Sequence, residues 1–338
     1  MQYKRSRIAK LKYRFRKFKR QLRYRLIWLV AILAVVLVFV AAFFLVHGGN
    51  INQGQGEFLQ GGVTDDNPGG GDHGGGVQNG HNTFNEETME VHYIDVGQGD
   101  ATLIKCGDKA MLIDAGDNSK GTKVQSYLKK QGVSKLDYVI GTHPDGDHIG
   151  GLDVIIYKFI CGTILMPDKS SDSTSYRDVI AAMESKSYKQ TFPTVGNTYA
   201  LGNATFTIIA PNKNYEESNN ASIGIILHYG QKSFLFTGDA ETDSEMDIIA
   251  GGINIKCDVY KAGHHGSKSS SCAALLNAAS PAYAVISCGK NNDYGHPHTQ
   301  TINQFTQRGI KIFRTDEHGS VVAVTDGKDI KWMCERGY

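Results

Sequence analysis

The stretch THPDGDHIGG, residues 142–151, places His143, Asp145, Asp147 and His148 within six positions. Almost no apolar side chain separates them, so a polar surface loop is one explanation of the pattern. A metal site is the other, because imidazole nitrogen and carboxylate oxygen are ordinary ligands of zinc. The alternation of His143, Asp145 and Asp147 places three such groups on one side of a turn. His148 follows directly, where it can reach a second ion.

More polar residues of the same types follow other apolar segments of the chain. They come with glycine, which lets the backbone turn tightly where a strand ends. They are Asp95 and Asp100 in IDVGQGD, Asp114 and Asp117 in LIDAGD, Asp239 in FTGDAE, His264 and His265 in KAGHHGSKSS, and His296 and His298 in GHPH. Loops that a rigid scaffold holds are common positions for active sites. We expect a site for one or two divalent ions, zinc or manganese, at which Asp239 could bridge two ions and a phosphate oxygen could bind.

The segments that must position these groups are apolar runs bounded by turn residues, a pattern typical of strands. Strands are predicted at residues 89–96, 101–106, 110–116, 136–142, 204–210, 222–230, 232–239, 257–263, 282–287, 310–315 and 320–327. Helices are predicted at residues 121–132, 176–187, 240–251, 269–279 and 301–309. Because the strands come in runs before and between the helices, the order favours two sheets covered by helices over one doubly wound sheet. The sequence therefore predicts a mixed α/β domain over residues 87–338.

From about Val91 to Trp332, this sequence resembles the metallo-β-lactamase superfamily and, within it, the C-terminal hydrolase domain of the competence protein ComEC. The matching segments are IDVGQGDATLI, MLIDAGD, THPDGDHIGGL, NNASIGIIL, FLFTGDAE, YKAGHHGSKSS, ISCGKNNDYGHPH and FRTDEHGSVV. The resemblance implies a four-layer αββα sandwich with the metal ions at one edge of the sheets. It also implies a hydrolase, with phosphodiesters as the leading class of substrate.

The resemblance implies roles for the ligand residues as well. The superfamily signature HxHxDH falls on residues 143–148. His143 and Asp145 would bind a first ion, Asp147 and His148 a second ion, and Asp239 would bridge the two.

The resemblance leaves open which histidine of the His264 and His265 pair is a ligand. With His265 as the ligand, His264 would contact the substrate phosphate, and His296 would stabilise charge on the scissile group. The residues implied in catalysis are then Asp147, His264 and His296. Those implied in substrate binding are Asn220, Ser267, Lys290 and His298.

Two positions depart from the superfamily pattern. Asp145 stands where most members have histidine. The position at which many members supply a third histidine to the first ion falls near residues 219–222, where Asn220 and Ser222 are poor substitutes. Both departures are shared with the ComEC-like branch. They predict a weak first site, or one that prefers manganese to zinc.

The chain before this domain has a different charge and composition. Residues 1–25 hold 12 Lys and Arg and no Asp or Glu, whereas the remaining chain holds 24 basic and 34 acidic residues, a net charge of −10. Leu26 to Val46 contain no charge, Gly or Pro, and this run is long enough to cross a hydrocarbon core of about 30 Å. A secretory signal peptide has a shorter apolar region that ends at a small-residue cleavage site, and no clear site of that kind follows here.

We therefore expect a basic cytoplasmic tail at residues 1–25 and a transmembrane helix at residues 26–46. Thirteen glycines between residues 48 and 85 predict a flexible linker, assigned to residues 47–86. Because basic flanks stay in the cytoplasm, the protein should be a single-pass protein of the cell membrane with its catalytic domain outside. The membrane is then a partner of the chain through this helix, and no protein partner is predicted.

The six cysteines are widely spaced and form no CxxC pair, which argues against a cysteine-based zinc site. Outside the membrane they could form disulfides, and free buried cysteines fit the sequence equally well.

Three functions fit the motifs. The first is a metal-dependent phosphodiesterase or nuclease, the second a phosphocholine esterase-like hydrolase of cell-wall polymers, and the third a non-catalytic binding module with the same fold. The net charge of −10 beyond residue 25 argues against strong non-specific DNA binding, which usually needs a basic patch. A nuclease remains one of the alternatives, because bound metal ions would add positive charge near the motifs. The nearby Lys261, Lys268 and Lys290 add more. A β-lactamase is disfavoured by Asp145 and by the missing third histidine.

Overall fold

The structure is a computed structural model that describes residues 88–337. The predicted tail (1–25), transmembrane helix (26–46) and linker (47–86) lie outside the described residues and stay predictions. Between residues 88 and 337, no helix is both long and apolar enough to cross a membrane.

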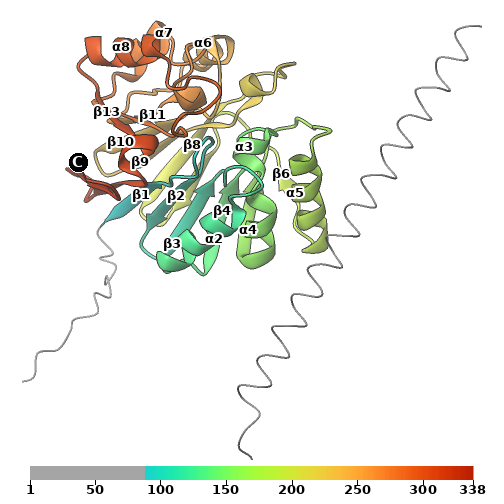
Figure 1. Ribbon diagram of the computed structural model, residues 1–338. Coiled ribbons are helices and arrows are strands. Elements are labelled where there is room, and N and C mark those ends of the chain that lie inside the picture. The colour runs from blue at the N-terminus through green and yellow to red at the C-terminus, as the bar shows by residue number, and fades with distance from the viewer. Residues whose placement is uncertain (1–87, 338) are drawn as a thin grey trace, which may run out of the picture. The chain divides into compact units, whose positions relative to one another are not determined.

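Two mixed sheets form the centre of this domain, as predicted (Figure 1). The first sheet runs in the order β15 (Ile330–Cys334), β14 (Val321–Thr325), β1 (Met89–Tyr93), β2 (Thr102–Cys106), β3 (Lys109–Ile113), β4 (Lys135–Ile140), β5 (Ile160–Leu165) and β6 (Gln190–Thr191). The second runs in the order β13 (Lys311–Arg314), β12 (Tyr283–Ile286), β11 (Val259–Lys261), β10 (Lys232–Phe236), β9 (Gly224–Tyr229), β8 (Ala204–Ala210) and β7 (Thr198–Leu201). In each sheet an antiparallel part continues into a parallel part, β3 to β6 in the first and β10 to β13 in the second.

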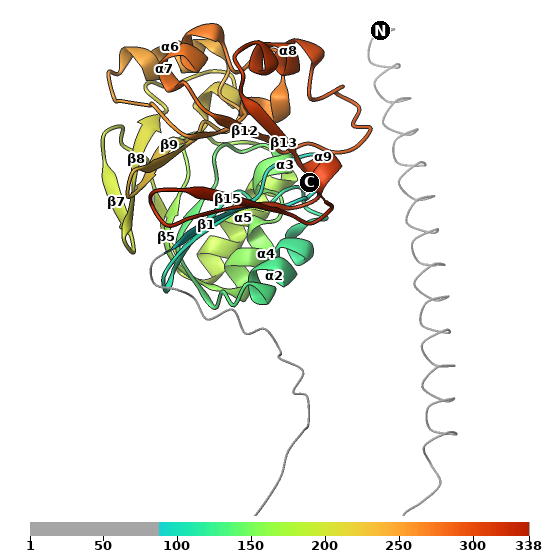
Figure 2. The same ribbon diagram turned by 90° about the vertical axis from the view of Figure 1, so that its left-hand side faces the viewer.

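Helices cover the outer face of each sheet, as Figure 2 shows. Three of them, α2 (Gly121–Lys130), α4 (Leu152–Lys158) and α5 (Thr174–Ser185), pack on the first sheet. Another three, α6 (Thr242–Ala250), α7 (Ala273–Ala279) and α8 (Thr299–Gln307), pack on the second. Buried apolar side chains fill the space between the sheets and the space under each helix layer. The layers are therefore helices, sheet, sheet and helices.

The side-chain pattern explains why these segments take these positions. Successive residues of a strand point to opposite faces, so a strand in the middle layers must be apolar on both. In β2, for example, Ile104 packs between the sheets while Leu103 packs under the helices. In α2, Val124 and Leu128 lie four residues apart and bury one helix face against the sheet.

The structure corrects several predicted boundaries. The helix predicted at residues 269–279 begins only at Ala273, because the backbone amides of Ser271 and Cys272 donate to the buried carboxylate of Glu245. Helices α3 (Gly146–Ile149) and α4 and strands β5, β6, β7 and β15 occupy residues for which no element was predicted. All six cysteines are free, and four of them are buried.

The topology gathers the polar motifs at one edge of the sheets. Strands β1, β3 and β4 run in the same direction in the first sheet, and β10, β11 and β12 run parallel in the second. The loop that follows each of these strands carries one of the predicted motifs. The loop after β1 also touches the loop after β4, because the Asp100 amide donates to the Asp147 carbonyl at 3.1 Å.

Gly99 makes this approach feasible, which yields a first prediction. Its φ is +126°, and a Cβ added there would collide with the Asp147 carbonyl oxygen. Gly107, in the turn between β2 and β3, also has a positive φ (+61°) but has open space around it. We expect Gly107→Ala to cost about 1 kcal/mol from backbone strain alone, and Gly99→Ala about 3 kcal/mol or more, since the clash adds to the strain.

Urea unfolding of the two full-length variants measures the difference. Equal losses in the two variants would mean that the contact between Gly99 and Asp147 does not constrain the fold.

Candidate metal centre

The motif THPDGDHIGG, residues 142–151, follows the end of β4 and includes the single turn of α3. His143 and Asp145 precede the turn, and Asp147 and His148 belong to it. His143 and His148 are fully buried, whereas the Asp147 side chain is 34% exposed and that of Asp145 45%. The motif thus has a buried edge of imidazoles and a more accessible edge of carboxylates.

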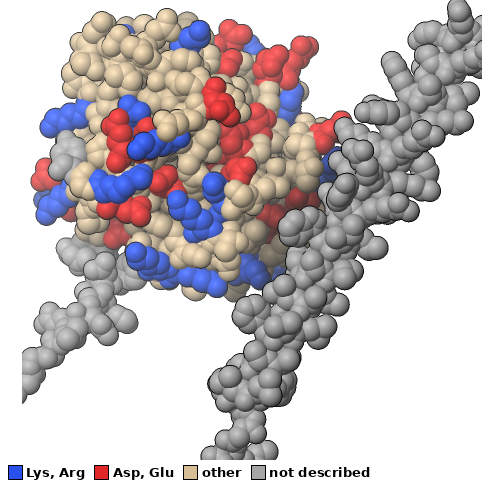
Figure 3. Space-filling model, in the orientation of Figure 1, with Lys and Arg blue, Asp and Glu red and all other residues tan. Residues whose placement is uncertain are grey.

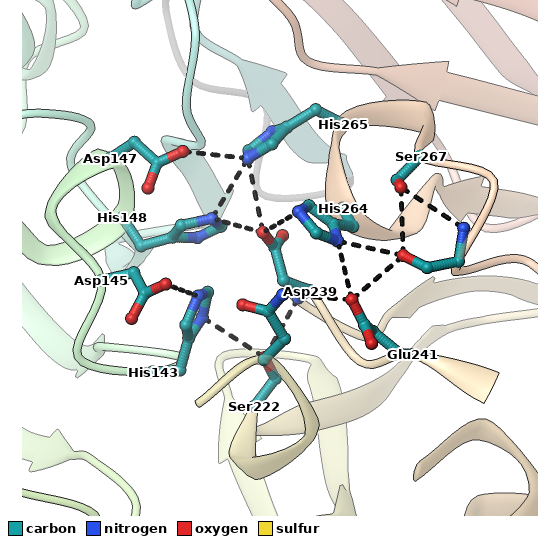
Figure 4. Close-up of polar contacts among 12 residues, drawn as sticks. His143, Asp145, Asp147, His148, Ser222, Asp239, Glu241, His264, His265 and Ser267 are labelled. Carbon is teal, nitrogen blue, oxygen red and sulfur yellow. Dashed lines mark hydrogen bonds and ion pairs between the residues drawn. The ribbon is translucent and has the colours of Figure 1, made fainter. Parts of the chain in front are cut away.

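The buried imidazoles converge on Asp239, which follows β10 (Figure 4). The Oδ2 atom of Asp239 lies 3.2 Å from His148 Nε2, 3.5 Å from His265 Nε2 and 3.6 Å from His264 Nε2. The Nε2 atoms of His148 and His265 are only 3.3 Å apart. Asp147 approaches the same His265 nitrogen at 3.3 Å. Ligand atoms from both sheets therefore point at one small volume.

Two atoms at this place support metal binding directly. His143 Nε2 and Asp239 Oδ1 are buried and have no hydrogen-bond partner among residues 88–337. Burial of a polar atom without a partner costs free energy. The His143 ring lies 4.2 Å from the His148 ring, and its free Nε2 is 3.7 Å from Asp145 Oδ2. One or two divalent ions would satisfy these orphaned atoms, so the donor set fits the predicted metal.

Asp114 fixes His148 in the orientation that metal binding needs. It accepts from His148 Nδ1 at 2.8 Å and from the amide and hydroxyl of Thr142. The Nδ1 edge of the ring is thereby occupied, and Nε2 faces Asp239. Carboxylates in this position commonly orient metal-binding histidines.

At His265, the Ser287 carbonyl accepts from Nδ1 at 3.1 Å, and Asp100 lies beside the same edge of the ring as an ion-pair partner. The donor atoms of Asp100, His148, Asp239 and His265 all lie within 4.8 Å of one another. Asp100, however, lies 3.2 Å from Nδ1 of His265, at the opposite side of the ring from Nε2, and forms an ion pair with Lys261 at 2.8 Å. Asp100 is therefore a charge partner of His265 and Lys261, and its Oδ1 is a further buried atom without a hydrogen-bond partner among residues 88–337. The sequence placed Asp100 and Asp114 near the site but did not predict their individual roles. The only signal was their position at the ends of predicted strands.

Charged neighbours set the protonation of the buried groups. Burial by itself would lower the pKa of His148, but Asp239 and Asp114 outweigh it and hold that pKa well above its usual value. Burial is outweighed in the same way at His265, where Asp239 and Asp100 raise the pKa to about 10. Burial would raise the pKa of Asp239, yet His148 and His265 hold it well below its usual range. Without metal, two imidazolium groups thus offset part of the negative charge of the surrounding carboxylates.

The His264–His265 pair sits in strained backbone. Both residues have positive φ values, 49° and 54°, in the short 3-10 helix η2 (Gly263–Gly266). Non-glycine residues adopt this region at a cost, and such strain is frequent at functional sites. The two rings diverge as a result: His265 is buried against Asp100 and Ser287, and the His264 side chain is 22% exposed near Asp239 and Glu241. This placement is compatible with His265 as ligand and His264 as a group that faces the substrate.

The remaining predicted site residues lie around this cluster. The His296 ring contacts the rings of His264 and His265, with centroids 5.3 and 6.1 Å away. Ser267 bonds to Ser269, and His298 Nδ1 accepts from the Lys268 amide. Lys290 is exposed. Their roles stay predictions.

The structure also shows what the unusual residues near 219–222 contact. Asn220 accepts from the amides of Glu241 and Ser244, so its amide oxygen anchors the loop after β10. The Ser222 hydroxyl accepts from the Asp239 amide at 3.0 Å and lies 3.3 Å from His143 Nδ1. Ser222 therefore contacts the side of His143 opposite the orphaned Nε2. The substrate-binding role of Asn220 stays a prediction.

The protonation pattern predicts how metal affinity depends on pH. A metal ion binds unprotonated imidazole, so it must displace the protons of His148 and His265. Asp147 and Asp239 are already ionised at neutral pH. Against the effect of burial, His265 and His148 lower the pKa of Asp147 to about 2, and they hold the pKa of Asp239 well below its usual range. We expect release of about two protons on metal binding at pH 7 and an apparent affinity that rises as pH increases towards 10.

Calorimetric titration of the metal-free, full-length protein with zinc or manganese measures this release in buffers of different ionisation enthalpy. The same affinity at pH 6 and pH 8, without proton release, would show that the metal does not displace protons from these two histidines.

Known proteins with similar sequences support the assignment. Residues 94–290 match the metallo-beta-lactamase superfamily. The chain is 30% identical over 251 residues to ComE operon protein 3 of Bacillus subtilis (strain 168). The matched region covers 69% of this chain and 32% of that protein. It is 31% identical over 244 residues to Recombination protein 2 of Haemophilus influenzae, covering 70% of this chain and 29% of that protein. It is also 31% identical over 240 residues to Competence protein ComA of Neisseria gonorrhoeae, covering 70% and 32%.

The matched part of this chain spans about a third of the length of these relatives. It confirms the predicted resemblance to ComEC-like proteins, and the family match includes every predicted metal ligand from His143 to His265. This chain therefore belongs to the metallo-β-lactamase superfamily.

Proposed function

We propose that residues 87–338 form a metal-dependent phosphodiesterase or nuclease of the ComEC-like type. The observation that carries this proposal is the convergence of His148, His265 and Asp239 beside the orphaned Nε2 of His143. One or two zinc or manganese ions would be held by His143, Asp145, Asp147, His148, Asp239 and His265. When bound, a divalent ion supplies Lewis acidity and an activated water for hydrolysis.

The protein's own groups then bind and orient the phosphodiester. His264 is partly exposed beside Asp239, where it can contact a phosphate oxygen. Burial and the neighbouring His264 and His265 lower the pKa of His296 to about 4. His296 is therefore neutral at pH 7, and we propose that its N–H donates to charge that develops on the scissile group. Asp147, at the accessible edge of the site, would hold the ion as an ionised carboxylate, in keeping with its lowered pKa of about 2.

The relatives favour DNA as the phosphodiester, because their names refer to competence and recombination. Surface charge gives less guidance. Figure 3 shows acidic and basic side chains interspersed over one face of the domain, without a continuous basic patch. DNA affinity would then depend on contacts at the site more than on general attraction to the backbone.

We also propose that residues 26–46 anchor the protein in the cell membrane, with residues 1–25 in the cytoplasm. The uncharged run and its basic flank support this orientation. Residues 47–86 would then connect the anchor to a catalytic domain outside the cytoplasm.

Removal of single ligands tests the hydrolase. In full-length protein purified in detergent, Asp147→Ala and His148→Ala should lose bound metal. Cleavage of single-stranded DNA and of bis-p-nitrophenyl phosphate should fall roughly 100-fold or more, since each change removes a direct ligand. Metal analysis and initial rates with manganese and with zinc provide the readouts.

Two matched variants control for the substitutions themselves. Asp108→Ala changes an exposed aspartate in the β2–β3 turn, and His228→Ala an exposed histidine on β9, and both should keep metal and activity. Full metal content and activity in Asp147→Ala and His148→Ala would refute the metal hydrolase. Cleavage of the small diester without cleavage of DNA would favour the phosphocholine esterase-like function.

The anchor has a separate test. With residues 26–46 present, the protein should stay in membranes after a carbonate wash. Protease added to intact spheroplasts should remove the catalytic domain and spare a tag on the N-terminus. Deletion of residues 26–46 should release the protein from the membrane. Protection of the catalytic domain from protease would show that this domain lies in the cytoplasm and would contradict the proposed orientation.

A further inference from the structure

An open pocket adjoins the metal centre on the side of His296. It measures about 590 Å³ and lies between the segment 290–297 and α9 (Thr315–His318), with Arg336 also in its lining. Since His296 lines the pocket and also contacts the rings of His264 and His265, the pocket and the metal centre share this side chain as a common wall.

The segment that forms one side of the pocket is held in a fixed shape by Asn292. The side-chain amide of Asn292 donates to the carbonyls of Gly289 and His296. Its oxygen accepts from the amides of Tyr294 and His296. Four hydrogen bonds from one side chain therefore set the position of Tyr294 relative to His296.

Tyr294 is the most exposed large apolar side chain in the described part of the chain, at 66%. Its ring stacks on His296, with centroids 5.6 Å apart and an angle of 21° between the planes. His296 itself is only 8% exposed, and its Nδ1 has no hydrogen-bond partner among residues 88–337. An aromatic ring that a buried imidazole supports from behind leaves its other face open to solvent.

The charges around the pocket differ in how they are paired. Arg314 forms ion pairs with Asp316 and Glu317, and Arg336 forms one with Asp95. Lys290 also lines the pocket but has no ion pair or hydrogen bond with any residue between 88 and 337. Of these three cations, Lys290 is the one whose charge is available to a ligand.

We propose that this pocket binds the nucleotide next to the scissile phosphodiester in single-stranded nucleic acid, with a phosphate at Lys290, which lines the pocket, and the base stacked on Tyr294, which lies beside the lining residues Gly295 and His296. This inference rests on the proposed function and specifies the substrate of the same site. Stacking on an aromatic side chain requires an unpaired base and tolerates any sequence. A duplex hides its base faces, so Tyr294 would discriminate against it.

The experiment separates binding from cleavage. Full-length protein with manganese is titrated into a fluorescent phosphorothioate oligothymidylate, and affinity is read from anisotropy. Tyr294→Ala should weaken binding about tenfold or more, and Tyr294→Phe should bind within about twofold of the native protein. Tyr157→Ala, which removes an exposed tyrosine on α4, is the matched control and should have no effect.

A strand of the same length with abasic residues tests whether the base is what binds. The native protein and Tyr294→Ala should bind it equally. Lys290→Ala should weaken binding of both strands by a similar factor and reduce the slope of log affinity against log salt by about 1.

Three results would each overturn the proposal. They are unchanged affinity of Tyr294→Ala for oligothymidylate, an equal loss for the abasic strand, and tighter binding of duplex than of single strand. Because anisotropy needs no turnover, base-dependent binding by a protein that cleaves neither DNA nor the small diester would refute the hydrolase and leave the stacking site standing.

Discussion

The buried negative charge of Asp239 is the constraint on which the rest of the site depends. A carboxylate removed from water costs several kcal/mol unless opposite charge and hydrogen bonds compensate it. Here His148 and His265 supply that compensation, and each is held by a further carboxylate, Asp114 or Asp100. The chain of alternating charges ends at Lys261. A divalent ion would therefore bind where the buried carboxylate of Asp239 already attracts positive charge.

The fold creates this place by bringing tight loops together at one edge of two sheets. Gly99 allows the loop after β1 to reach the backbone of Asp147, and the left-handed backbone at His264 and His265 turns two adjacent imidazoles to different sides. Both features cost conformational energy. The strands beneath, buried on two faces, are rigid enough to impose them.

Much of this arrangement could be predicted from the sequence, for identifiable reasons. Apolar runs ended by glycine and a polar residue located β1 to β4 and β8 to β14, and histidine and aspartate at strand ends located the cluster. The short helices α3 and α4 escaped prediction because three glycines and the polar motif interrupt their apolar pattern. The roles of Asp100 and Lys261 could not be predicted, because their pairing joins residues far apart in the sequence. The role of Asn292 was not predicted. It acts through hydrogen bonds that fix the backbone of its loop, and no sequence motif indicates such a role.

The ion pair between Asp100 and Lys261 has a consequence for how this domain can change. Asp100 belongs to a loop of the first sheet and Lys261 to β11 of the second, and both side chains are buried. Loss of either partner would leave a lone charge in the interior, which is more damaging than loss of the pair. Asp100 contacts His265 in the candidate metal centre and, through Lys261, also joins the two halves of the sandwich. Evolutionary replacement of this pair therefore requires both residues to change together, and stability alone favours keeping Asp100 beside the candidate metal centre, whatever chemistry that centre performs.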